Sequence, residues 1–190
     1  MRTAKIDRKT KETEISVEIN LDGSGIYQIN TGIGFFDHML TQISVHGLFD
    51  LSIKAKGDLH IDPHHTVEDC ALALGQALNQ ALGDRRGIGR YGFTLPMDES
   101  LAQVAVDLSG RPAVVFEADF PRDRVGEFST EMVKHFFASL SQSLGAAIHV
   151  KVSGENTHHM IEAVFKGAGR ALRPALERRG NQLPSTKGML

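Results

Sequence analysis

The chain has one cysteine, no apolar leader at its start and no long hydrophobic run. A single cysteine excludes a disulfide within the chain, and Cys70 lies in an apolar run, as expected for a buried small hydrophobic residue. Residues 1–9 lack the apolar stretch of a signal peptide, and nowhere do about 18 apolar residues follow one another, as a membrane-spanning helix requires. We therefore expect a cytoplasmic protein in a reducing compartment, with no membrane partner.

An excess of basic charge is also missing. The formal net charge is −2 at pH 7, so the chain offers no positive field to attract the phosphate backbone of a nucleic acid. The hydrophobic fraction of 41% and charged fraction of 23% place it among globular proteins rather than disordered or fibrous ones. We expect a small-molecule substrate and no nucleic-acid partner.

Histidine, in contrast, is plentiful, with nine residues in a chain that has no tryptophan. Four of them form two adjacent pairs, each within a His-His-x-x-Glu motif. The motifs are His64-His65-Thr66-Val67-Glu68 and His158-His159-Met160-Ile161-Glu162. His60 and His149 lie outside this pattern, and we expect them at surfaces or strand ends.

The hydrophobic pattern predicts the same order of elements twice. In the first half it predicts a strand at Glu14–Ile19, a helix at Gly34–His46, a strand at Leu48–Lys56 and a helix from His64 or Thr66 that stops before Gly83. In the second half it predicts strands at Arg90–Pro96, Leu101–Leu108, Ala113–Ala118 and Ala147–Val152, and helices at Phe128–Leu144 and His158–Leu176. Each half reads as β-β-β-α-β-α.

Matching spacings support an internal duplication. Glu12 lies eleven residues before Gly23, and Glu99 lies eleven residues before Gly110. The later difference in spacing falls in a longer loop at residues 118–127, where insertions are tolerated. The predicted fold is therefore α+β, with two pseudosymmetric repeats (about 1–86 and 87–176) whose sheets enclose the helices, followed by a tail, 177–190.

The motif spacing favours a site for two metal ions. On a helix, the glutamate lies on the same face as both histidines, while adjacent histidines point about 100° apart and so reach different ions. His38 and His135 add one imidazole each from the preceding helix, which gives six histidines and two glutamates. Three imidazoles and one carboxylate per ion leave positions open, which favours manganese or iron over closed tetrahedral zinc, although zinc, cobalt and nickel also accept such ligands.

Several long blocks of the sequence resemble the imidazoleglycerol-phosphate dehydratases of histidine biosynthesis. They include residues 35–40, 62–69, 107–112, 154–163 and 184–188, and the resemblance covers nearly the whole chain. It implies a hydro-lyase of ribosomal protein S5 domain 2-like fold that converts imidazole-glycerol phosphate to imidazole-acetol phosphate. It also implies two manganese ions per active site and a homo-oligomer, a 24-mer with active sites at subunit interfaces.

The same resemblance implies roles for particular residues. The metal ligands would be His38, His64, His65, Glu68, His135, His158, His159 and Glu162. Substrate would contact Glu12, Gln42 and His46 besides the ligands His38, His64, His65 and Glu68, and its phosphate would bind Arg90, Arg111, Ser185 and Lys187. The carboxylates of Glu12, Glu68 and Glu162 would serve catalysis.

These roles suit a difficult elimination, because the proton to be removed lies on an unactivated carbon. If the substrate imidazole binds metal as imidazolate, its electrons can expel the neighbouring hydroxyl to give a diazafulvene. Glu12 could then shuttle the proton of the adjacent carbon. Glu99, the pseudosymmetric mate of Glu12, is either a vestige of the duplication or a residue that orients a ligand.

Two other functions use the same ligands. A binuclear-metal hydrolase would attack an ester or amide with a bridging hydroxide, and a structural shell protein would use the histidines only to join subunits. Some bacterial relatives carry an N-terminal phosphatase domain. This chain begins at the dehydratase itself, so we expect a monofunctional enzyme without histidinol-phosphate phosphatase activity.

Overall fold

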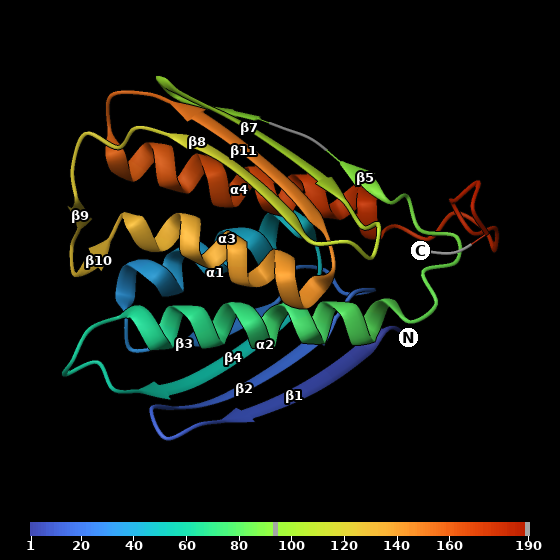
Figure 1. The fold of residues 1–190 in the computed structure, drawn as a ribbon, viewed down its shortest axis with the longest axis horizontal. Helices are drawn as coiled ribbons and strands as arrows, with labels where there is room; N and C mark the ends of the chain where they lie inside the picture. Colours follow the sequence, from blue (N-terminus) through green and yellow to red (C-terminus); the bar gives the residue numbers. More distant parts are fainter. Residues whose placement is uncertain (93–94, 189–190) are drawn as a thin grey trace.

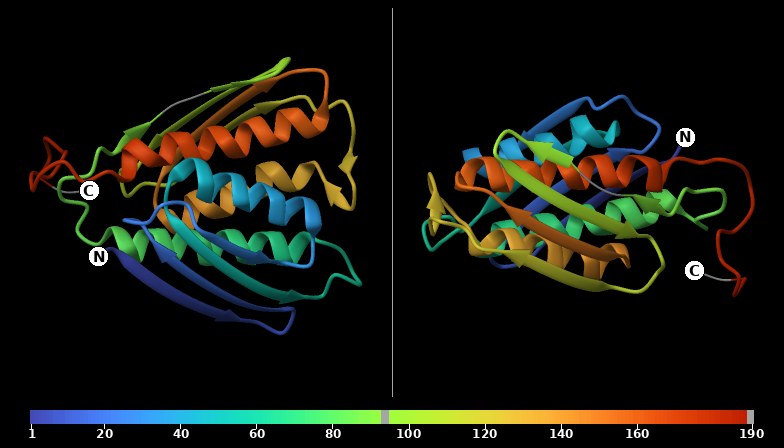
Figure 2. Two further views of the ribbon diagram at one scale, coloured as in Figure 1. Left: turned by 180° about the vertical axis from the view of Figure 1, so that it is seen from behind. Right: turned by 90° about the horizontal axis from the view of Figure 1, so that it is seen from above.

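Two β-sheets form the outer layers of the protein, and four helices lie between them (Figure 1). This arrangement is seen in a computed structural model that describes residues 1–92 and 95–188. Figure 2 shows the same order of layers from behind and from above. The helices are covered on both sides, which is why most of the buried apolar side chains lie in the helical layer and on the inner faces of the sheets.

The first repeat forms one sheet and two helices. Its elements are β1 (Thr3–Lys9), β2 (Thr13–Asn20), β3 (Tyr27–Asn30), α1 (Gly34–Gly47), β4 (Asp50–Gly57) and α2 (His64–Leu82). The sheet order is β1-β2-β4-β3, with β3 parallel to β4 and the other pairs antiparallel. Alternation along β2 buries Ile15, Val17 and Ile19 against the helices.

The second repeat follows the same plan. Its elements are β5 (Tyr91–Gly92), β6 (Leu95–Met97), β7 (Ser100–Asp107), β8 (Ala113–Ala118), α3 (Glu131–Leu144), β11 (Ala147–Ser153) and α4 (Thr157–Leu176). The sheet order is β5-β7-β11-β8, with β6 also paired to β7 and β8 parallel to β11. A short hairpin of β9 (Arg124–Val125) and β10 (Phe128–Ser129) occupies the long loop before α3.

The α+β class and the repeated β-β-β-α-β-α order are confirmed. Gly83 ends α2 with a positive φ of 61°, as predicted for a C-terminal cap. The helix predicted at Phe128–Leu144 begins only at Glu131, because Phe128–Ser129 pairs in the hairpin instead. Residues 93 and 94 of the strand predicted at Arg90–Pro96 lie outside the described residues, as do the last two residues of the tail. Among the helices that the structure describes, none is long and apolar enough to cross a membrane.

The four helices pack in pairs that cross between the repeats. Helix α2 packs against α3, and α1 packs against α4. Each pair meets at a glycine eleven residues after the first histidine of a motif. A Cβ atom added to Gly75 would lie 2.9 Å from the Leu140 carbonyl oxygen, and one added to Gly169 would lie 2.7 Å from that of Ile43. The two backbones therefore approach more closely than any larger residue allows.

We predict that Gly169→Ala destabilises the protein even though alanine is the better helix former. Alanine in a helix interior gains about 1 kcal/mol over glycine, but overpacking against a fixed backbone typically costs about 1–3 kcal/mol. Gly167→Ala is the matched control, since its Cβ would meet the end of the Val104 side chain rather than backbone. Urea unfolding of the two variants measures the difference, and equal or greater stability of Gly169→Ala would contradict the packing argument.

Candidate metal centre

Both His-His-x-x-Glu motifs lie in the first turn of a helix, where a polar side chain holds the start in place. At α4, the Asn156 side chain accepts hydrogen bonds from the backbone N–H groups of His158 and His159. At α2, an Asp62 carboxylate oxygen lies 2.7 Å from the backbone nitrogen of His64 and accepts its hydrogen bond. The N-cap of α4 and the Asp62 hydrogen bond just before α2 both hold the first turn, so the two motifs begin at the same end of the helical layer (Figure 1).

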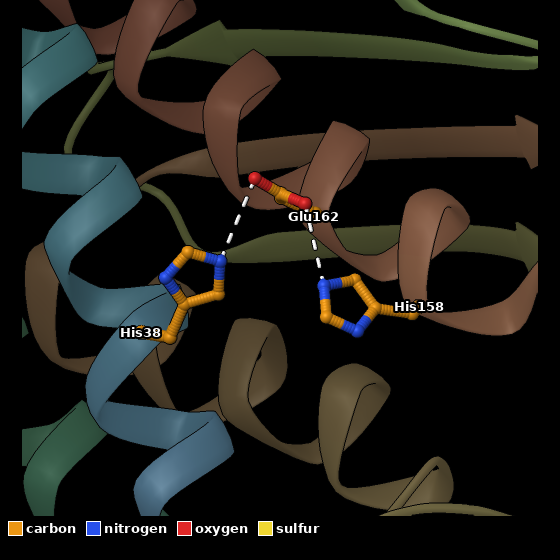
Figure 3. A group of neighbouring side chains, drawn as sticks. All are labelled: His38, His158 and Glu162. Carbon is orange, nitrogen blue, oxygen red and sulfur yellow. Dashed lines mark ion pairs between the residues drawn. The ribbon is translucent and has the colours of Figure 1, made fainter.

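One group of ligands, the His38 cluster, consists of His38, His158 and Glu162 (Figure 3). The Nε2 atoms of His38 and His158 lie 3.5 Å and 3.4 Å from the two carboxylate oxygens of Glu162. The glutamate is buried, while both imidazoles are partly open to solvent. All three side chains therefore converge on one small region at the α1–α4 crossing.

The second group, the His64 cluster, consists of His64, Glu68 and His135. The ligand types repeat those of the first group, but here Nε2 of His64 and Nε2 of His135 lie 3.9 Å and 3.6 Å from the same oxygen, Oε2 of Glu68. The two rings are 4.5 Å apart between centroids. Here α2 and α3 take the places of α4 and α1.

Each cluster combines residues from both repeats. His38, from the first repeat, joins the motif of the second, and His135, from the second repeat, joins the motif of the first. This exchange follows from the helix pairs, because α1 packs on α4 and α3 packs on α2. The structure brings six of the eight predicted ligands together in this way.

The remaining two predicted ligands, His65 and His159, lie outside both clusters. Neither belongs to the group of ligand atoms that the first histidine of its own motif forms, as expected because neighbouring side chains on a helix point about 100° apart. Each cluster within one chain therefore has two imidazoles and one carboxylate, rather than the predicted three imidazoles and one carboxylate. The second histidine of each motif faces elsewhere and remains available to a different ion.

Carboxylates hold these two outer histidines. Nδ1 of His65 donates to Asp58 Oδ2 at 2.9 Å, and Nδ1 of His159 donates to Glu99 Oε2 at 2.9 Å. The hydrogen bond that His65 donates to Asp58 raises the pKa of His65, and the one that His159 donates to Glu99 raises the pKa of His159. In return, the hydrogen bond with His159 lowers the pKa of Glu99 to about 2. Glu99 is therefore a hydrogen-bond partner of a predicted ligand, which favours the orienting role over a vestige.

Lys166 is a charged neighbour of the His38 cluster that the motif search did not single out. Its Nζ lies 2.9 Å from Glu162 Oε1, one helical turn away. Burial alone would raise the pKa of Glu162, but the hydrogen bond and charge of Lys166 outweigh it, so the net pKa is lowered. The i, i+4 spacing to Glu162 was the available sequence signal. Burial and the charge of Lys166 also lower the pKa of His46.

The predicted substrate contacts divide into two places. Gln42 and His46 follow His38 along α1, and the Gln42 amide nitrogen lies 3.3 Å from Nδ1 of His38. Glu12 is exposed in the turn between β1 and β2, with a carboxylate oxygen 4.0 Å from Nε2 of His65. Glu12 and Gln42 are at the same end of the helices as the histidine motifs, whereas His46 lies in the last turn of α1.

The predicted phosphate ligands lie at the opposite end. Arg90 is adjacent to the last turn of α4, where its backbone N–H donates to the Ala175 carbonyl oxygen, and it also reaches the tail by donating to Pro184. Arg111 follows Gly110, which contacts Gly145 at the end of α3. With a rise of about 1.5 Å per residue, His158 and Ala175 are roughly 25 Å apart along α4. One chain therefore does not bring Arg90, Arg111, Ser185 and Lys187 to the clusters.

Arg90 is also strongly engaged where it is. Its guanidinium forms two hydrogen bonds with the Asp107 carboxylate and a third with the Pro184 carbonyl oxygen. The bond to Asp107 raises the pKa of Arg90. Since a guanidinium has five N–H donors, two remain for another partner. In this structure Arg90 positions the tail, of which the exposed Lys187 is part.

The ligand atoms of both clusters fit a divalent metal ion. All four clustered histidines turn Nε2 toward the carboxylate, and in each cluster the atoms that could bind an ion lie within 4.8 Å of one another. Nε2 of His135 is buried and has no hydrogen-bond partner within the described chain. A buried polar atom without a partner is costly, and binding an ion would satisfy it. Neutral imidazoles with a carboxylate are suitable ligands for manganese, iron or zinc.

We predict that His135→Ala weakens manganese binding, because it removes a ligand of the His64 cluster. Losing even an outer partner of a ligand typically costs about 10–100-fold in affinity, so we expect a loss at the upper end of that range or beyond. His149→Ala, an exposed histidine of β11, is the control. Calorimetric titration of metal-depleted protein with Mn²⁺ measures both, and parent-like binding by His135→Ala would exclude it as a ligand.

Comparison with known proteins identifies where this architecture occurs. Residues 31–172 match the family described as imidazoleglycerol-phosphate dehydratase. The imidazoleglycerol-phosphate dehydratase of Cereibacter sphaeroides is 55% identical over 195 residues, covering 100% of each chain. The crystal structure of the dehydratase from Staphylococcus aureus superposes with a TM-score of 0.84 at 39% identity, covering 93% of this chain and 99% of that one. The enzyme from Pyrococcus furiosus, solved in complex with (S)-C348, superposes with a TM-score of 0.85 at 38% identity, covering 97% and 100%.

Some relatives are longer. The histidine biosynthesis bifunctional protein HisB of Stenotrophomonas maltophilia is 61% identical over 189 residues, which cover 100% of this chain and 53% of that protein. The chain thus spans about half the length of the bifunctional relatives that it matches.

Proposed function

The chain belongs to the imidazoleglycerol-phosphate dehydratase family, and we propose that it removes water from D-erythro-imidazole-glycerol phosphate to give imidazole-acetol phosphate in histidine biosynthesis. The observation that carries this proposal is the pair of matched clusters, each with two imidazoles and a carboxylate, at the start of the helices. Their similarity to each other and their exposure at one end of the molecule favour a reaction site over a structural staple.

We propose that the clusters hold two manganese ions, which as Lewis acids would favour the deprotonated substrate imidazole, whose ring electrons can then expel the hydroxyl. The buried carboxylate of Glu162 and the less buried one of Glu68 supply negative charge for this purpose. Lys166 forms an ion pair with Glu162, and its positive charge also acts on His46. This cationic side chain therefore limits the charge of the His38 cluster.

A second copy of the chain completes the site in this proposal. Within one chain, Arg90 and the tail that it contacts lie by the last turn of α4, roughly 25 Å along that helix from His158, whereas the substrate is a glycerol phosphate with one imidazole ring. The two outer histidines are also held by carboxylates outside their own clusters. Both features are explained if Arg111, Ser185 and Lys187 of one subunit meet the clusters of another, with Arg90 holding the tail in place.

Glu12 is the residue we propose as the acid/base. Its carboxylate lies in an exposed turn that a hydrogen-bond network holds: the hydroxyl oxygen of Thr10 accepts from the backbone N–H groups of Glu12 and Thr13, and the Thr13 hydroxyl donates to Asp69. The turn is therefore rigid while the Glu12 side chain remains free to reach a substrate. A carboxylate placed in this manner is suited to moving a proton between carbon and water.

We predict that Glu12→Gln lowers kcat by roughly 10²–10⁴-fold, the usual contribution of general acid–base catalysis, while manganese content is unchanged. Glu14→Gln, which removes an exposed carboxylate two residues away, should keep full activity. Formation of the ketone product from imidazole-glycerol phosphate is the measurement. Full activity in Glu12→Gln would remove it from the mechanism, and release of inorganic phosphate by the parent would favour a hydrolase instead.

Removal of metal should abolish activity and yield smaller assemblies. The reason is that ligands drawn from separate elements, and in this proposal from separate chains, couple assembly to metal binding. Light scattering before and after chelation gives the particle size, and adding Mn²⁺ back should restore both size and turnover. A chelated protein of undiminished size would show that assembly does not depend on the ions.

A further inference from the structure

The outer histidines share one feature despite their different surroundings. In both, Nδ1 is held at 2.9 Å by a carboxylate, Asp58 for His65 and Glu99 for His159. A neutral imidazole that donates from Nδ1 has its lone pair on Nε2. Nε2 is also the atom that the four clustered histidines turn toward their carboxylates. All six histidines can thus present the same nitrogen.

The two carboxylates do not occupy equivalent positions. Glu99 lies in the turn before β7 and is the mate of Glu12, as the matching spacing to Gly110 and Gly23 shows. Asp58 follows β4, and the strand registers align it with Glu155 after β11. The same contact therefore arises from two different places in the repeat, which simple inheritance from the duplication does not explain.

Glu99 is held by further hydrogen bonds of its own, whereas Asp58 is held by burial and its Oδ1 has no hydrogen-bond partner among the described residues. Glu99 Oε1 accepts hydrogen bonds from the Ser100 hydroxyl and the Asn156 backbone N–H, each at 3.1 Å, which leaves Oε2 for His159. The Asp58 side chain is only 10% exposed, and its backbone carbonyl accepts from Ile61. The orientation of each imidazole is thereby set by the protein itself.

The use of Asp58 in one repeat and Glu99 in the other also explains why the pseudosymmetric pair Glu12 and Glu99 have different contacts. In the second repeat Glu99 is used by His159, whereas in the first repeat Asp58 takes that role, and Glu12 lies 4.0 Å from the other nitrogen of His65. Glu12 is therefore not occupied as a hydrogen-bond partner of Nδ1. This difference between the repeats leaves one carboxylate available for proton transfer.

We propose that Asp58 and Glu99 are positioning residues, which hold His65 and His159 in the tautomer and orientation that present Nε2 to a metal ion. The proposal rests on the proposed function, since it concerns ligands of the same ions. Partners of this kind raise the affinity of a metal site by typically 10–100-fold. The proposal gives Asp58 a role that Glu155, at the equivalent position of the other repeat, does not share.

The test is a titration of the metal-depleted full-length protein with Mn²⁺ at constant pH. We expect Asp58→Asn and Glu99→Gln each to weaken binding by about 10–100-fold, with the number of ions per chain unchanged. The conservative variants Asp58→Glu and Glu99→Asp, which keep the carboxylate, should recover part of the loss. Glu155→Gln, which removes an exposed carboxylate near His159, is the matched control and should bind like the parent.

Each other result has a distinct meaning. Parent-like affinity in both Asp58→Asn and Glu99→Gln, while the parent binds two ions per chain, would overturn the inference but not the proposed function. A parent that binds no Mn²⁺ would overturn both. Loss of one ion per chain in Glu99→Gln would make Glu99 a ligand, together with Asp98 and His159, rather than a positioning residue. Urea unfolding of the metal-free variants must match the parent, because a lower stability would assign the effect to folding.

Discussion

The close crossing of two helix pairs is the constraint on which the rest of the structure depends. At Gly75 and Gly169 the backbones of α2 and α3, and of α4 and α1, approach so closely that a methyl group would collide with a carbonyl oxygen. The crossings join the repeats, since each pair takes one helix from either half of the chain. Close contact also brings the side chains near the helix starts within reach of one another, and the histidine clusters form there.

Duplication accounts for the two clusters, and divergence accounts for their differences. Both clusters use the same ligand types with the same nitrogen, so they have one design. The residues that contact the ligands differ, however: Glu162 is paired with Lys166, and the carboxylates that hold His65 and His159 come from non-equivalent positions. A symmetrical centre would hold a symmetrical ligand, whereas imidazole-glycerol phosphate has a ring at one end and a phosphate at the other. Divergence of the repeats is therefore what the proposed reaction on such a substrate would require.

The length of the helices separates the two kinds of binding group. Histidines occupy the starts of α2 and α4, while Arg90, Arg111 and the tail lie near the ends of α3 and α4. A helix of this length keeps them apart in one chain but brings them together wherever the end of one subunit meets the start of another. The separation makes catalysis depend on assembly in the proposed enzyme, with the Arg90–Asp107 pair setting the position of the tail.

The sequence by itself determined the repeat, the order of its elements and the types of ligand, because these depend on local periodicity and on spacing along one helix. Helix α3 was predicted three residues too early, since the pairing of β9 with β10 is a contact between segments that local propensity does not register. Only the tertiary structure decided that His38 joins the second motif and His135 the first, because the choice is made by which helices pack together. The same holds for Asp58, whose contact with His65 spans a loop that has no periodic pattern. Partners brought together by packing are set by the shapes of whole surfaces, and the residues that form them carry no signal until the chain has folded.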